Sequence, residues 1–66
     1  YPMELRIGTY YLESGDSENA AEALREGYDR MPNHLQILRA YSTALLKLGK
    51  IETAAKVAQQ IEGVKK

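Results

Sequence analysis

The sequence predicts an all-helical fold built from two stacked antiparallel helical hairpins. Apolar residues recur at every third or fourth position, which is typical of helices that bury one face. No segment shows a sustained two-residue alternation, so strands are not expected. Similar residues also recur 34 positions apart, as Gly15 and Gly49 do. We therefore divide the chain into a first unit over about residues 1–34 and a second over about residues 35–66.

Size and charge restrict the possible functions. The chain has 66 residues, enough for one small domain, and its nine basic and nine acidic residues cancel. Balanced charge argues against binding to nucleic acid or a membrane surface through net charge. No apolar run approaches the roughly 18 residues of a membrane span, and no cysteine is available for a disulfide or a thiolate metal site. Because the first residue is Tyr1 and not methionine, we expect a processed protein or a fragment of a longer one.

The first helix is expected over residues 3–14. Met3, Ile7 and Tyr11 recur at four-residue intervals and form an apolar stripe. Gly15 then ends the helix, because glycine adopts the left-handed backbone conformation at little cost.

The second helix is expected to form a tight hairpin with the first. Ala20, Leu24 and Gly27 lie on one side of it, at spacings of four and three. The small residues at the two ends of this stripe allow another helix to approach closely, and Leu24 fills the space between them. The helix runs to about Arg30 and is closed by Pro32, which disfavours helical geometry in the preceding residue.

Capping residues predict where the second and third helices begin. Asp16 or Ser17 can cap the second helix. Asn33 is expected to begin the third, with Gln36 three residues later completing a capping box.

The second unit is expected to repeat this hairpin. The third helix ends at Gly49, and the fourth runs from Ile51 to about Glu62, with Gly63 and the tail fraying. Val57 and Ile61 are at risk of exposure, because two repeat units leave an end uncovered. The apolar face of the third helix consists of Leu38, Tyr41, Leu45 and Leu48.

Several matched positions support the 34-residue period. A turn glycine, a pair of alanines and large apolar residues all recur at this one offset, and such a period is typical of stacked helix–turn–helix units. The matched pairs are Thr9 and Thr43, Leu12 and Leu46, Gly15 and Gly49, Glu18 and Glu52, Ala20 and Ala54, and Ala21 and Ala55.

Over nearly its whole length the sequence resembles the tetratricopeptide repeat family. Three positions depart from the family pattern. Glu4 stands where tryptophan is usual, and Ala58 and Ile61 exchange the usual large and small residues, so we expect Ile61 to compensate for Ala58. The matching residues are Ile7, Gly8, Tyr11, Ala20, Leu24, Gly27 and Pro32 in the first unit, and Leu38, Tyr41, Ser42, Leu45, Ala54, Ala58 and Ile61 in the second.

The resemblance implies a short right-handed α-solenoid in which the first helix of each unit lines a concave groove. Proteins of this family hold peptides or partner subunits there, so a non-catalytic scaffold for protein–protein interaction is expected. Arg6, Arg39 and Lys47 make the groove mildly basic, which suits an acidic or carboxylate-bearing partner. One sub-family binds C-terminal carboxylates through groove asparagines, which are missing here, so its chaperone binding is not expected. The implied groove residues are Leu5, Arg6, Thr9, Leu12, Glu13, Gln36, Arg39, Thr43 and Lys47.

Other functions remain open. The chain can instead be a structural spacer or an oligomerisation element, and we expect further repeats of the parent chain to adjoin it or the chain to self-associate. An RNA-binding helical repeat is a more distant alternative, because a surplus of basic residues is missing.

No residue pattern points to catalysis, a cofactor or a metal. His34 is the only histidine, and without a second ligand at metal spacing it is expected to lie on the surface. The acidic residues of the second helix are expected to form a solvated face, partly paired with Arg25 and Arg30. Tyr10 and Tyr28 lie off the apolar stripes, and either pack between helices or form an exposed contact.

Overall fold

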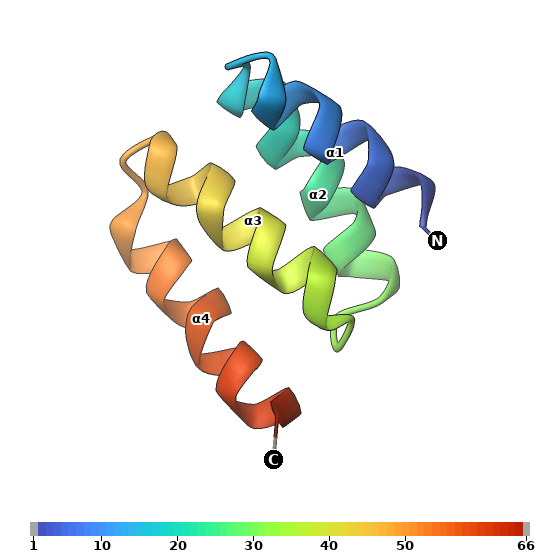
Figure 1. Cartoon of the computed structure of the whole chain (residues 1–66). Coiled ribbons are helices and arrows are strands. Elements are labelled where there is room, and N and C mark those ends of the chain that lie inside the picture. Colours follow the sequence, from blue (N-terminus) through green and yellow to red (C-terminus); the bar gives the residue numbers. More distant parts are fainter. Residues whose placement is uncertain (1, 66) are drawn as a thin grey trace.

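The structure, a computed structural model, describes residues 2–65 and contains four helices in that range. They are α1 (Met3–Glu13), α2 (Ser17–Arg30), α3 (Leu35–Lys47) and α4 (Ile51–Lys65), and they form two antiparallel hairpins (Figure 1). The described residues contain no strand. The predicted all-helical fold is therefore confirmed.

The helices form a flat stack of 32 × 27 × 16 Å. α1 packs against both α2 and α3, and α2 also packs against α3 (Figure 1). Among the described helices, α4 contacts α3 alone. All four helices contribute to one core, to which α4 adds Ala54 and Val57 through its packing on α3.

Both hairpin turns use the same backbone arrangement. Gly15 and Gly49 have φ values of +83° and +81°, in the left-handed region that favours glycine. After α1, the backbone N–H of Asp16 donates to the carbonyl oxygen of Tyr11 at 2.8 Å. The equivalent bond after α3 joins Lys50 to the carbonyl of Leu45 at 2.9 Å. These bonds satisfy carbonyls at the helix ends, as in a Schellman motif.

The start of α2 is capped by Asp16, one of the two predicted residues. Its carboxylate accepts hydrogen bonds from the backbone N–H of Asn19 at 3.2 Å and from the Asn19 amide at 2.6 Å. Ser17 is the first residue of the helix itself.

The predicted capping box at Asn33 and Gln36 is wrong by one residue. His34 is the N-cap of α3, and its Nδ1 accepts a hydrogen bond from the backbone N–H of Ile37 at 3.4 Å. The cause is a turn in which the N–H of His34 donates to the carbonyl of Met31 at 3.2 Å, so that Asn33 lies within the turn. His34 is half-buried.

The buried face of α1 differs from the predicted stripe. Met3 and Ile7 are 69% and 41% exposed, whereas Leu5 and Gly8 are buried and Tyr11 is half-buried. The helix bounds were close to the prediction, but α1 turns the neighbouring stripe toward α2 and α3.

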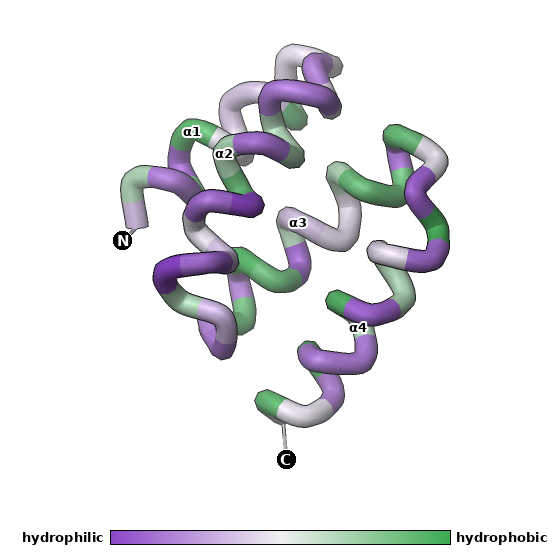
Figure 2. The backbone as a smooth tube through the Cα atoms, turned by 180° about the vertical axis from the view of Figure 1, so that it is seen from behind, coloured by the Kyte–Doolittle hydropathy of each residue, from purple (hydrophilic) through white to green (hydrophobic). Residues whose placement is uncertain are grey.

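The core is closed by direct packing of α2 on α1. Leu24 is fully buried, and a Cβ atom built on Gly8 would lie 2.4 Å from its Cγ. A glycine at position 8 is therefore needed for this approach. Figure 2 shows how hydrophobic positions alternate with hydrophilic ones along the helices, as one buried face requires. The buried residues are Leu5, Ala20, Ala21, Leu24, Ile37, Leu38, Tyr41, Ala44, Leu45, Ala54 and Val57.

α4 is longer than predicted, and it buries Val57, which we expected to be at risk of exposure. It continues past Glu62 to Lys65, and Gly63 lies inside it with no left-handed backbone to end it. Val57 is only 3% exposed. Ile61 is half-buried against the core while Ala58 is exposed. The predicted end of the tail at Lys66 and the residue Tyr1 lie outside the described residues.

One ion pair joins the two helices of the first hairpin. The Arg30 guanidinium donates to the Glu4 carboxylate, so Arg30 pairs across to α1 and not along α2 as expected. The side chain of Glu4 is only 14% exposed. A backbone hydrogen bond at the start of α1, and then the bond from Arg30, lower the pKa of Glu4.

We expect this carboxylate to make stability depend on pH. Because its pKa is lower in the folded state, its contribution is present above the unfolded pKa and is lost as the pH falls through the folded pKa. Glu4→Gln should therefore lower the urea midpoint at pH 7 and reduce the further loss on acidification to pH 3. Urea denaturation of both proteins at the two pH values measures this. An identical loss on acidification in both proteins would show that the pair contributes nothing.

Candidate functional site

The first helices of the two hairpins lie next to each other and carry polar stripes. Gln36, Arg39, Thr43 and Lys47 are exposed and recur at spacings of three and four along α3. On α1, Arg6 and Glu13 are exposed and Thr9 is half-buried, again at spacings of three and four. Since α1 packs against α3, the two stripes belong to adjacent helices.

The two leucines of the implied groove, Leu5 and Leu12, and Leu46, the equivalent of Leu12 in the second unit, differ in their exposure. Leu5 is 3% exposed and belongs to the core, so it offers no surface to a partner. Leu12 is half-buried, and its equivalent Leu46 is 58% exposed. Apolar contact with a partner would therefore come from Leu46 and the accessible part of Leu12.

Two hydroxyl groups are bound to the backbone of α3. Ser42 Oγ and Thr43 Oγ1 each donate to the carbonyl oxygen of Arg39 at 3.0 Å. The Thr43 hydroxyl therefore offers a partner its acceptor lone pairs, while its proton is held by the helix.

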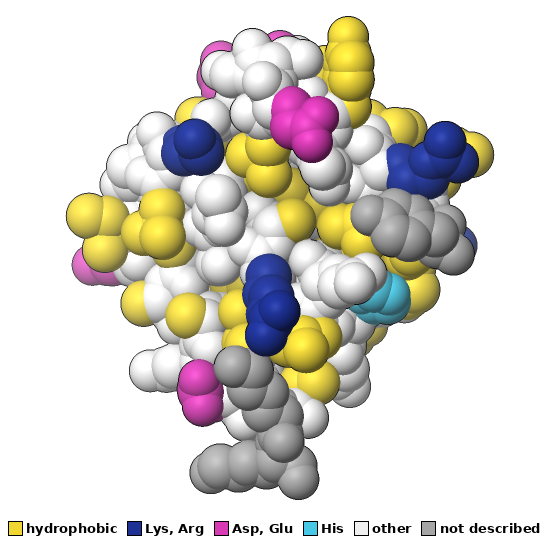
Figure 3. Space-filling model, in the orientation of Figure 1, with side chains coloured by type: hydrophobic (Ala, Val, Ile, Leu, Met, Phe, Trp, Pro, Cys, Tyr) yellow, Lys and Arg dark blue, Asp and Glu magenta, His cyan; other side chains and the backbone are white. Residues whose placement is uncertain are grey.

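The charges of these stripes are separated along the surface. Arg6, Arg39 and Lys47 are exposed, and Glu13 stands at the position in α1 equivalent to Lys47 in α3. Figure 3 shows Lys and Arg side chains set apart on one face of the molecule, with apolar, neutral and acidic side chains between them. Such a surface favours contact with several spaced acidic groups over one compact anion.

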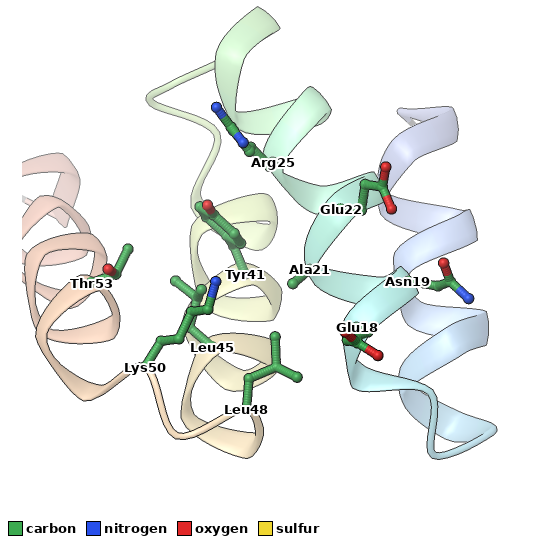
Figure 4. Close-up of a pocket in the computed structure, with 10 residues that line it drawn as sticks. All are labelled: Glu18, Asn19, Ala21, Glu22, Arg25, Tyr41, Leu45, Leu48, Lys50 and Thr53. Carbon is green, nitrogen blue, oxygen red and sulfur yellow. The ribbon is translucent and has the colours of Figure 1, made fainter.

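A pocket that the sequence did not predict opens between α2 and α4, with α3 at its back (Figure 4). Its volume is about 540 Å³, and Glu18 and Glu22 of α2 lie on one side of it with Lys50 on another. Tyr41 forms part of its inner wall, and burial raises the pKa of its hydroxyl. None of the nine predicted groove residues lines this pocket. It exists because α2 and α4 both contact α3, a tertiary arrangement with no local sequence signal.

The two off-stripe tyrosines have different environments. Tyr10 is 65% exposed and meets the ring of Tyr11 edge-on, with 5.7 Å between centroids. Tyr28 is half-buried and lies against Tyr41, with centroids 5.5 Å apart. Tyr28 therefore packs between helices, which is one of the two predicted alternatives, whereas Tyr10 is exposed and its contact with a partner stays a prediction.

Other kinds of site have no support in the described part of the chain. It contains no group of three or more His, Cys, Asp or Glu residues that is able to hold a metal ion. None of the helices in that part has both the length and the apolar character needed to cross a membrane.

Comparison with known proteins identifies the repeat. A family model described as tetratricopeptide repeat matches residues 11–64, a range that includes both hairpin turns. Searches of curated proteins and of solved structures give no match. Repeats of this family are generally non-catalytic and mediate protein–protein interaction. The match covers most of the chain and agrees with its two helical hairpins, and the chain belongs to the tetratricopeptide repeat family.

Proposed function

We propose that the chain is a non-catalytic scaffold that binds an acidic segment of a partner protein along α1 and α3. The observation that carries this proposal is the exposed stripe of Gln36, Arg39, Thr43 and Lys47 on α3, next to the α1 stripe that contains Arg6.

The mechanism is binding to a preformed surface. Both stripes lie on helices that the core holds in place, so little backbone ordering is needed when a partner binds. Arg6, Arg39 and Lys47 supply charge-assisted hydrogen bonds to carboxylates, and Gln36 supplies a neutral amide. Leu46 adds exposed apolar surface beside them.

Charge reversal with a matched control tests this proposal. One variant carries Arg6→Glu, Arg39→Glu and Lys47→Glu. The control carries the same change in net charge at three other exposed residues. These are Arg25 on α2, Lys50 in the turn between α3 and α4, and Lys56 on α4. Each protein is used to capture partners from lysate, and circular dichroism confirms that it is folded.

We expect the variant with Arg6, Arg39 and Lys47 reversed to capture at least about tenfold less partner protein than the parent chain, because three attractive contacts become repulsive. The control should retain it. Equal capture by all three proteins would contradict the proposal and would favour the second candidate, a structural or oligomerisation element. The exposed apolar residues of α1, Met3 and Tyr10, favour that second candidate.

A further inference from the structure

The pocket between α2 and α4 contains a buried tyrosine whose hydroxyl has no partner within the described residues. Tyr41 is only 8% exposed and forms part of the inner wall (Figure 4). None of the side-chain hydrogen bonds among the described residues involves its hydroxyl. Buried hydroxyl groups are usually hydrogen-bonded, because an unpaired one has lost its bonds to water without replacing them. The Tyr41 hydroxyl is therefore available to a group that enters the pocket.

Two cations lie at the same pocket. Arg25 lines it from α2, and Lys50 lines it from the turn before α4 and points into the space between α2 and α4 (Figure 4). Burial raises the pKa of the Tyr41 hydroxyl, and the nearby charge of Arg25 opposes that rise. Within the described residues the one ion pair joins Glu4 to Arg30, so neither cation of the pocket is paired there. An anion in the pocket would meet two positive charges and a hydroxyl donor.

The rest of the lining restricts the kind of anion. Glu18 and Glu22 also line the pocket, both are exposed, and Glu22 points toward the α1 side (Figure 4). These carboxylates would repel a group with two negative charges, such as a phosphate monoester at pH 7. Leu45 and Leu48 add apolar surface beside Tyr41. The lining therefore suits a molecule with one negative charge and a small apolar body.

We propose that this pocket binds a small-molecule carboxylate with an apolar body. The carboxylate accepts hydrogen bonds from Arg25, Lys50 and the Tyr41 hydroxyl, and the apolar body lies against the Tyr41 ring and Leu48. The volume of about 540 Å³ is within the range of small-molecule sites, which is about 300–1,000 Å³. None of the implied groove residues lines the pocket, so the site is separate from the stripes of α1 and α3.

Phenylacetate is the probe that tests this site, because it carries one carboxylate on an aromatic body. Amide chemical shifts of the ¹⁵N-labelled chain are followed during titration with phenylacetate, phenylacetamide and phenyl phosphate at one ionic strength. Phenylacetamide replaces the carboxylate with a neutral group of nearly the same shape. We expect phenylacetate to give saturable shifts at Tyr41, Leu45, Leu48 and Lys50, with a Kd of about 1–10 mM. Phenylacetamide should give none, and phenyl phosphate should bind more weakly.

Three substitutions and a matched control assign the binding to these side chains. Lys50→Gln and Arg25→Gln each remove one charge from an exposed residue and should weaken phenylacetate binding about tenfold. Tyr41→Phe keeps the ring and removes the hydroxyl, which should weaken binding roughly threefold to tenfold. Lys56→Gln removes the same charge from an exposed residue of α4 outside the pocket and should leave binding unchanged. The amide spectrum of each variant confirms that it is folded.

Several results would overturn the proposal. They are the absence of saturable shifts with phenylacetate, equal binding of phenylacetamide, and tighter binding of phenyl phosphate. A loss of binding in Lys56→Gln as large as that in Lys50→Gln would also overturn it. The titration contains no partner protein, so its failure would leave the function proposed for the stripes of α1 and α3 untouched.

Discussion

Leu24→Ala is expected to destabilise the chain by about 3–5 kcal/mol, the range for fully buried leucines in well-packed cores. Leu24 has no exposed surface, and it packs against Gly8 where α2 approaches α1. A core of this size rarely supplies more than about 3–5 kcal/mol in total. The variant should therefore be largely unfolded at 25 °C, which far-ultraviolet circular dichroism would show as a loss of helical signal.

Leu46→Ala is the matched control for this substitution. Leu46 is a leucine on α3 with 58% of its surface exposed, so its truncation should change stability by less than about 1 kcal/mol. Urea denaturation of the control and the parent chain measures the difference. Similar losses for Leu24→Ala and Leu46→Ala would contradict the packing described for the first hairpin.

Glycine-to-alanine substitutions at two helical positions are expected to have opposite effects. A Cβ at position 8 would lie 2.4 Å from Cγ and 2.6 Å from Cδ2 of the buried Leu24, so one of the helices must shift. Overpacking of this kind costs about 1–3 kcal/mol, which exceeds the gain of about 1 kcal/mol in helix propensity. Gly8→Ala should therefore lower the urea midpoint.

Gly63→Ala should raise the urea midpoint. The site lies within α4, and a Cβ there meets nothing within 4 Å. Only the helix-propensity gain of roughly 0.5–1 kcal/mol then remains. Comparing the two variants separates the effect of close packing from that of helix propensity on stability, because both place the same methyl group in a helix. Stabilisation by Gly8→Ala would contradict the close approach of α1 and α2.

Local signals were enough to predict the order of the helices. The turn glycines Gly15 and Gly49 and the 34-residue period define two hairpins from sequence alone. Local signals could not choose the buried face of α1, because the stripes through Ile7 and through Leu5 are both apolar and lie side by side. The choice depends on contacts with α2 and α3, which only the tertiary fold supplies.

The ends of the helices and the candidate site also depend partly on local sequence signals and partly on tertiary contacts. The capping of α3 by His34 depends on the turn before it, and Asn33 has the stronger intrinsic preference for an N-cap. The exposure of Arg39 and Lys47 could be predicted from their place on the polar face of α3, whereas the burial of Leu5 depends on the packing of α1 against the other helices. The pocket between α2 and α4 has no sequence signal at all.

The proposed function requires that the exposed sides of α1 and α3 form the binding surface. Amide chemical shifts of the ¹⁵N-labelled chain test it most directly, during titration with a pool of random acidic peptides and with a matched pool in which lysine replaces each acidic residue. We expect the acidic pool alone to shift amides along the stripes of Arg6 and Thr9 on α1 and of Arg39 and Thr43 on α3. Shifts of equal size with both pools, or shifts confined to the pocket between α2 and α4, would contradict the claim.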